Sequence, residues 1–155
     1  MTTPVSPLVD LLKLRAHVEG GWFTECWRTA QEIPQSVLGP KYSGDRASAT
    51  GVYFLLHPGE VSNWHVVLSD ELWIWQAGSP IELTLGGSAE HPEDGERFIL
   101  GMDIAAGQRP TALVPAGVWQ TARPIGDEAG FVTCIVAPGF EYDDFRLVEK
   151  TEESK

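Results

Sequence analysis

The residues best suited to chemistry lie in one stretch, residues 61–78, which contains His65, Glu71 and three of the six tryptophans of the chain. A histidine titrates near neutral pH, and a neighbouring carboxylate can set its tautomer and raise its basicity. We therefore interpret His65 and Glu71 as a catalytic pair, with His65 as general acid or base. Proton abstraction next to a carbonyl is the reaction that such a pair suits.

Alternating residues in this stretch predict two strands joined by a short turn as a hairpin. Asn63 and His65 would share one face of the first strand, and Glu71, Trp73 and Trp75 one face of the second. A buried imidazole or carboxylate without a partner is costly, so this mixture of polar atoms and aromatic rings favours the lining of a pocket over a solid core. The sequence thus predicts a small-molecule site.

Aromatic rings and a few polar groups should form the walls of this pocket. Trp119 stands beside Gln120, and three charged residues adjoin the glycine pair at positions 20 and 21, where they would form the rim. Beyond the catalytic pair, the candidate ligand-binding residues are Trp73, Trp75, Trp119, Gln120, Asn63, Glu19, Glu25 and Arg28.

The remainder of the chain predicts mostly strands. Apolar residues at helical spacing between positions 8 and 14 indicate a short N-terminal helix that ends near His17, and residues 29–46 have the glycines and prolines of a loop. Short strands between turns argue for an all-β sandwich or barrel. Strands are expected at 22–28, 48–56, 81–85, 97–100, 112–114, 119–123 and 131–137.

The length of 155 residues suits a single domain over 1–155, with a core at about 8–148 and a flexible tail at 149–155. Two cysteines, Cys26 and Cys134, are expected to be buried free thiols.

Residues 65–78 resemble the first motif of the cupin superfamily, in which a His-x-His pair precedes a glutamate and a glycine. His65, Glu71 and Gly78 match this pattern, and Val67 stands where the second histidine would be. The second cupin motif has Pro-x-Gly before a further histidine.

Pro115 and Gly117 match that second motif, whereas Gln120 occupies the place of its histidine. Further stretches are similar to the cupin-5 family of small single-domain cupins, whose functions are largely unassigned. These stretches are 17–23 (HVEGGWF), 53–56 (YFLL), 69–73 (SDELW), 114–119 (VPAGVW) and 137–145 (APGFEYDDF).

The resemblance implies a double-stranded β-helix, or jelly roll, with a pocket between its sheets. A divalent metal, if bound, would be held by His65, Glu71 and Gln120, but two of the usual histidines are replaced, so no cofactor is expected. The preferred function is a metal-free isomerase, epimerase or cyclase. The alternatives are a non-catalytic protein that binds or senses a metabolite, and a metal-dependent oxygenase or lyase.

The net charge and the hydropathy of the chain limit which binding partners and which cellular compartment we expect. The net charge of −11 repels phosphate backbones and excludes nucleic acid as an expected partner. Neither a secretory signal nor an apolar run of membrane-spanning length is visible, so we expect a cytoplasmic protein without a membrane partner. The resemblance, together with apolar residues such as Leu72 and Ile74 on an outward strand face, predicts a homodimer.

Overall fold

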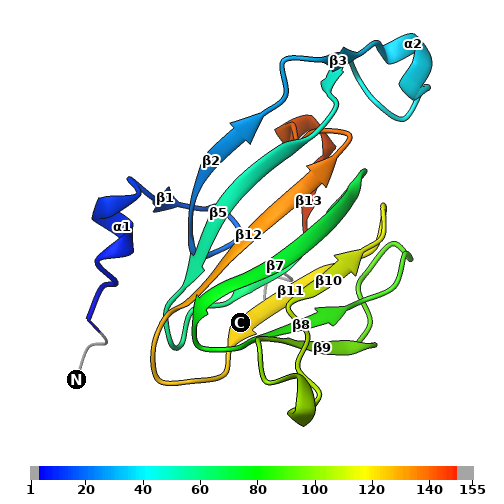
Figure 1. Cartoon of the computed structure of the whole chain (residues 1–155). Coiled ribbons are helices and arrows are strands. Elements are labelled where there is room, and N and C mark those ends of the chain that lie inside the picture. Colours follow the sequence, from blue (N-terminus) through cyan, green and yellow to red (C-terminus); the bar gives the residue numbers. More distant parts are fainter. Residues whose placement is uncertain (1–3, 150–155) are drawn as a thin grey trace, which may run out of the picture.

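The structure, a computed structural model, describes residues 4–149, and most of its strands form two facing antiparallel sheets, with β3 (Glu32–Ile33) and β4 (Arg46–Ala47) paired as a separate short sheet (Figure 1). The first sheet has the order β1 (Arg15–Ala16), β2 (Trp22–Arg28), β5 (Thr50–Leu56), β12 (Gly130–Ala137), β7 (Asp70–Gly78) and β10 (Thr111–Val114). The second has the order β13 (Phe145–Leu147), β6 (Ser62–Val67), β11 (Gln120–Pro124), β8 (Ile81–Leu85) and β9 (Arg97–Leu100). The predicted strands and the all-β class are confirmed.

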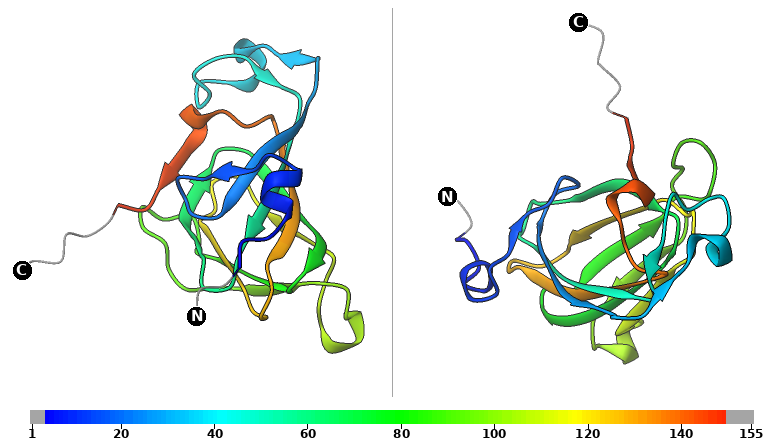
Figure 2. Two further views of the ribbon diagram at one scale, coloured as in Figure 1. Left: turned by 90° about the vertical axis from the view of Figure 1, so that its left-hand side faces the viewer. Right: turned by 90° about the horizontal axis from the view of Figure 1, so that it is seen from above.

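The main core lies between the sheets, where both contribute inward side chains. Phe54 and Trp73 of the first sheet pack in one apolar cluster with Leu83 and Ala122 of the second. Alternation along each strand turns every second residue toward this layer, and burial of one large apolar side chain contributes about 1.5–3 kcal/mol to stability. Seen from above, the two sheets curve round a common interior (Figure 2).

The predicted hairpin between β6 and β7 is wrong. These strands belong to opposite sheets: β6 pairs with β11 and β13, while β7 pairs with β12 and β10. Because both edges of each strand are already hydrogen-bonded, the turn at Leu68 and Ser69 carries the chain across the sandwich. His65 and Glu71 therefore reach the interior from opposite walls.

The N-terminal helix is shorter than expected. Helix α1 (Leu8–Leu11) ends before Lys13, whose φ of 57° is incompatible with a continuing helix, and the chain then joins the edge of the first sheet as β1. Val9 and Leu14 pack against Leu55 on the outer face of that sheet, so α1 lies outside the sandwich (Figure 2). No helix within residues 4–149 is long and apolar enough to cross a membrane.

Two other expectations need correction. The predicted loop at 29–46 contains β3 (Glu32–Ile33), α2 (Gln35–Leu38) and the start of β4 (Arg46–Ala47), which project beyond the sandwich (Figure 1). Of the two free thiols, Cys134 is buried but Cys26 is exposed, because Cys26 lies outside the cluster that α1 covers. The predicted tail falls outside the described residues, apart from Glu149.

The last turn, η2 (Tyr142–Asp144), is attached to the body of the protein by a buried ion pair; a second turn, η1 (Ile104–Ala106), precedes β10. The Arg46 guanidinium of β4 donates two hydrogen bonds to the Asp144 carboxylate, Nε to Oδ2 at 2.8 Å and Nη2 to Oδ1 at 2.7 Å. This two-point contact fixes orientation as well as distance. It holds η2 and β13 in place.

We expect Asp144→Asn to lower the free energy of unfolding by about 3 kcal/mol, because the substitution leaves the Arg46 guanidinium buried without a counter-charge. Asp94→Asn is the matched control, since the pair of Asp94 with Arg97 is exposed and should contribute about 1 kcal/mol or less. Urea unfolding at one pH measures both. Equal losses in the two variants would contradict a special role for the buried pair.

Candidate active site

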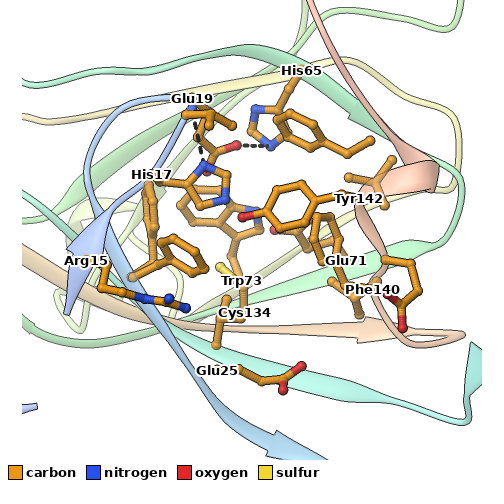
Figure 3. Close-up of a pocket in the computed structure, with 18 of the residues that line it drawn as sticks. Arg15, His17, Glu19, Glu25, His65, Glu71, Trp73, Cys134, Phe140 and Tyr142 are labelled. Carbon is orange, nitrogen blue, oxygen red and sulfur yellow. Dashed lines mark hydrogen bonds and ion pairs between the residues drawn. The ribbon is translucent and has the colours of Figure 1, made fainter. Parts of the chain in front are cut away.

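A cavity of about 540 Å³ opens between the sheets, a size suited to a small-molecule ligand (Figure 3). Its walls are largely aromatic and come from segments far apart in the chain. Phe23 and Phe54 lie on the first sheet with Trp73, while Tyr142 and Phe145 come from the C-terminal segment that Arg46 and Asp144 anchor.

His65 forms a buried ion pair in the wall of this cavity. Its Nδ1–H donates to the Asn63 carbonyl oxygen at 2.8 Å, and its Nε2 lies 3.0 Å from Oε2 of Glu19. Both ring nitrogens thus face acceptors, an arrangement that an imidazolium satisfies. Burial alone would lower the pKa of His65, but the Glu19 carboxylate outweighs burial and raises that pKa to about 9.

Glu19 reaches His65 through a tight loop at the start of the first sheet. Gly20 and Gly21 have φ values of 107° and 78°, and a Cβ at Gly20 would lie 2.1 Å from the Val61 carbonyl oxygen. The backbone N–H and the side-chain amide of Asn63 both donate to the Glu19 carbonyl, at 2.7 and 2.8 Å. Although burial opposes ionisation, His65 holds the pKa of Glu19 below its ordinary value.

Glu71 enters the cavity from β7 of the first sheet, on the side opposite to His65. Its carboxylate is oriented by a buried chain of hydrogen bonds. Trp73 Nε1–H donates to Oε1 of Gln120 at 2.8 Å, which turns the Gln120 amide nitrogen toward Oε2 of Glu71 at 3.2 Å. Burial raises the pKa of Glu71 to about 7, against the opposing effects of the His65 charge and the Gln120 hydrogen bond. Both protonation states of Glu71 are therefore populated at neutral pH.

Several of the residues predicted from sequence come together here. Glu19, Glu25, Arg28, His65, Glu71 and Trp73 line the cavity. Gln120 lies behind it, as the support of Glu71.

Three other predicted residues lie away from the cavity. Trp75 Nε1–H donates to the Ser79 carbonyl, whereas Trp119 is buried under Arg146 and donates to the Ala89 carbonyl. Asn63 is exposed.

Two irregularities in the strands explain which side chains face inward. The pairing of β6 with β11 slips by one residue between Ser62 and His65, so both of these are buried, and Asn63 does not share the face of His65. A similar slip in β2 between Glu25 and Trp27 brings Arg28 to the cavity side together with Glu25. Strict alternation in the sequence could not reveal either slip.

Other cavity residues were missed by the sequence analysis. His17 and Cys134 line the cavity beside Glu71 and Glu19, together with Tyr142 (Figure 3). Phe145 lines it as well. Burial raises the pKa of the Cys134 thiol, so this group stays protonated. The family resemblance could have pointed to three of these residues. The stretches 17–23 and 137–145 that resemble the family contain His17, Tyr142 and Phe145.

The residues that would hold a metal in a cupin do not fit that role as they are arranged. Both nitrogens of His65 face other groups, the Gln120 oxygen accepts from Trp73, and the place of a further histidine is held by the apolar Val67. Within residues 4–149, no three His, Cys, Asp or Glu side chains gather as a metal-binding group.

Two facing antiparallel sheets around a small-molecule cavity define a cupin jelly roll. The chain belongs to the Cupin_5 family, described as "Cupin superfamily (DUF985)", whose family model matches residues 6–148. The resemblance seen in the sequence is thereby confirmed, and the protein is a cupin of the small-molecule-binding type.

The chain is similar to proteins from bacteria and eukaryotes. Protein SO0799 from Shewanella oneidensis is 34% identical with a TM-score of 0.79, over 92% of this chain and 82% of that chain. A hypothetical protein from Leishmania major is 27% identical with a TM-score of 0.77, over 90% and 84% of the two chains. The uncharacterized protein YML079W of Saccharomyces cerevisiae is 28% identical over 170 residues, covering 100% of this chain and 82% of the yeast protein.

We expect Glu19→Gln to lower the pKa of His65 well below its value of about 9, because the substitution removes the carboxylate that favours the imidazolium. A ¹H–¹⁵N NMR titration of the histidine side chains measures this change. Glu25→Gln, a change at the exposed mouth of the cavity, is the control and should leave His65 unaltered. Titration of His65 at the same pH in Glu19→Gln would show that Glu19 does not set its charge.

Proposed function

We propose that this cupin is a metal-free enzyme that moves a proton at a carbon next to a carbonyl, as an isomerase, epimerase or cyclase. The observation that carries this proposal is the Glu71 carboxyl, which is held by Gln120 in an aromatic cavity and is only 8% exposed. With a pKa of about 7, Glu71 can accept and return a proton at neutral pH. The His65–Glu19 pair supplies fixed charges beside it.

The geometry favours a division of roles that differs from the one predicted from sequence. His65 has its two ring nitrogens committed to Asn63 and Glu19, so it lacks a free lone pair for a substrate proton. Glu71 lines the cavity and has one oxygen anchored by Gln120. We therefore assign the proton transfer to Glu71 and an electrostatic role to the His65 imidazolium.

The proposed reaction is balanced within the substrate. The Glu71 carboxylate takes the proton from the carbon, the electrons of the broken C–H bond form a C=C bond, and the carbonyl oxygen becomes an enolate. The Glu71 carboxylic acid then returns its proton to the other face of that carbon, which is an epimerisation, or to the enolate oxygen, which gives the enol. With a hydroxy ketone the proton can instead go to the former carbonyl carbon while the neighbouring hydroxyl proton passes to the enolate oxygen, which gives the isomeric hydroxy aldehyde. No external oxidant or reductant is needed.

We expect the protein to catalyse exchange of carbon-bound hydrogen for deuterium in a panel of hydroxy ketones, aldoses and β-keto esters in D₂O. Glu71→Gln keeps the shape of the side chain but removes its basicity, and should slow the exchange by about 100-fold or more. Mass spectrometry of the recovered compounds measures the exchange. Glu93→Gln, at an exposed carboxylate, is the control.

The pH profile of that exchange tests the assignment further. The rate should rise as Glu71 ionises near pH 7 and fall as His65 loses its charge near pH 9. A cavity that binds these compounds without any exchange would instead identify a metabolite-binding or sensing protein. An activity that a chelator abolishes and a divalent ion restores would favour the oxygenase or lyase alternative.

We also propose a homodimer that pairs the outer faces of the six-stranded sheets. Leu113, Leu72 and Ile135 lie in one row across β10, β7 and β12, and Ile74 lies in the next row. Leu113 is 49% exposed, although it is a large apolar side chain in the middle of a strand. A second copy of the same face would cover this row symmetrically.

Light scattering after gel filtration should give twice the chain mass of 17.0 kDa for the native protein, and Leu113→Glu should shift it toward one chain mass. The carboxylate that this substitution introduces would be buried without a partner at the proposed interface. Ile104→Glu, an exposed site on η1 away from this row, is the control and should remain dimeric. A native protein of one chain mass would remove this proposal.

A further inference from the structure

His17 is the one cavity histidine that the proposed reaction leaves without a role. Its Nδ1 accepts a hydrogen bond from the backbone N–H of Glu19 at 3.1 Å. A nitrogen that accepts cannot itself be protonated, so the proton of the neutral ring is on Nε2. Burial lowers the pKa of His17, which keeps the ring neutral at physiological pH.

The ring of His17 is held rigidly by its surroundings. It packs edge-on against Phe23, with ring centroids 4.4 Å apart, and lies near Phe54 and Phe145 at 6.1 and 5.9 Å. Its side chain is 10% exposed, and that surface lines the cavity. Orientation and tautomer are both set before any ligand arrives.

The Nε2–H group of His17 is a donor without a protein acceptor. No residue within 4–149 accepts a hydrogen bond from it, and in Figure 3 this nitrogen points away from Glu19 into the space between Glu71, Trp73 and Tyr142. Because this nitrogen is accessible from the cavity, a ligand bound there can supply the acceptor that the protein does not.

The charges around the cavity limit what that acceptor can be. Beside His17, the buried pair of Glu19 and His65 sums to zero, and Glu71 adds either no charge or one negative charge. The exposed Arg15 adds a positive charge to the cavity lining, whereas Arg28 is paired with Glu25 and Glu141. An anionic group placed next to Glu71 would be repelled, whereas a neutral carbonyl oxygen would not. The aromatic walls in turn suit a planar, apolar body.

We propose that the Nε2–H of His17 binds and polarises the carbonyl oxygen of the ligand, and that the ligand class is a ketone or aldehyde with a planar apolar part. This inference rests on the proposed function, since it supplies the group that stabilises the enolate oxygen while Glu71 holds the proton. A fixed neutral imidazole donor can stabilise developing oxyanion charge without transferring its own proton.

The test uses acetophenone labelled with ¹³C at the carbonyl, together with ¹⁵N-labelled protein. Long-range ¹H–¹⁵N spectra at pH 7 should show the Nε2–H tautomer for His17 and the imidazolium for His65. The bound carbonyl ¹³C resonance should lie downfield in the native protein compared with His17→Phe. The same variant should bind acetophenone about three- to tenfold more weakly, the effect of one neutral hydrogen bond.

Two further variants separate hydrogen bonding from packing. His17→Gln keeps an N–H donor and should recover part of the downfield shift, whereas Tyr142→Phe removes the other nearby hydroxyl of the wall and should leave the shift unchanged. The inference is overturned if His17 carries its proton on Nδ1 or on both nitrogens. It is also overturned if the shift survives in His17→Phe, or if acetophenone does not bind.

The test of His17 gives its answer whether or not Glu71 catalyses deuterium exchange. A carbonyl shift that depends on His17 in a protein that exchanges no compound would support the ligand class and remove the proposed catalysis. Exchange that depends on Glu71 but proceeds equally fast in His17→Phe would remove the role of His17 and leave the proposed function in place.

Discussion

The buried ion pair between Glu19 and His65 is the interaction on which the site depends. Two charges at 6% and 2% exposure are tolerated because each neutralises the other. Asn63 fixes both partners, since its carbonyl accepts from the His65 ring and its side-chain amide donates to the Glu19 main-chain carbonyl. The pair requires the loop at Gly20, whose close approach to Val61 leaves no room for a side chain. It joins the edge of the first sheet to β6, the second strand of the other sheet, and so closes one end of the cavity wall.

This pair also makes the protonation of the two cavity glutamates, Glu19 and Glu71, different. Glu19 contacts an imidazolium directly and is kept ionised, whereas Glu71 is chiefly desolvated and has the neutral groups of Gln120 and Cys134 as its hydrogen-bonding neighbours. The same residue type therefore has its pKa moved in opposite directions within one cavity. Such a divergence is typical of sites where one carboxylate provides charge and the other exchanges a proton.

The cavity wall formed by Tyr142 and Phe145 depends on a contact far from the two glutamates. Arg46 and Asp144 tie the C-terminal turn to the short β3–β4 sheet, and through that turn Tyr142 and Phe145 are held over the cavity. The rings of His65 and Phe145 lie 5.4 Å apart, so the ion pair and the aromatic wall are in contact. The cavity is thus closed by residues separated by more than half the chain.

The sequence by itself determined the strands, the all-β class and the family resemblance, because alternation and turn residues are local properties and the motifs extend through most of the chain. It also identified His65, Glu71 and Trp73 as neighbours. Only the tertiary structure decided that β6 and β7 lie in opposite sheets, that single-residue slips turn Asn63 outward and Arg28 inward, and that Glu19, not Glu71, bonds His65. Strand pairing and bulges depend on contacts between distant segments, and the protonation of a buried group depends on all its neighbours at once, so neither can be read from local spacing.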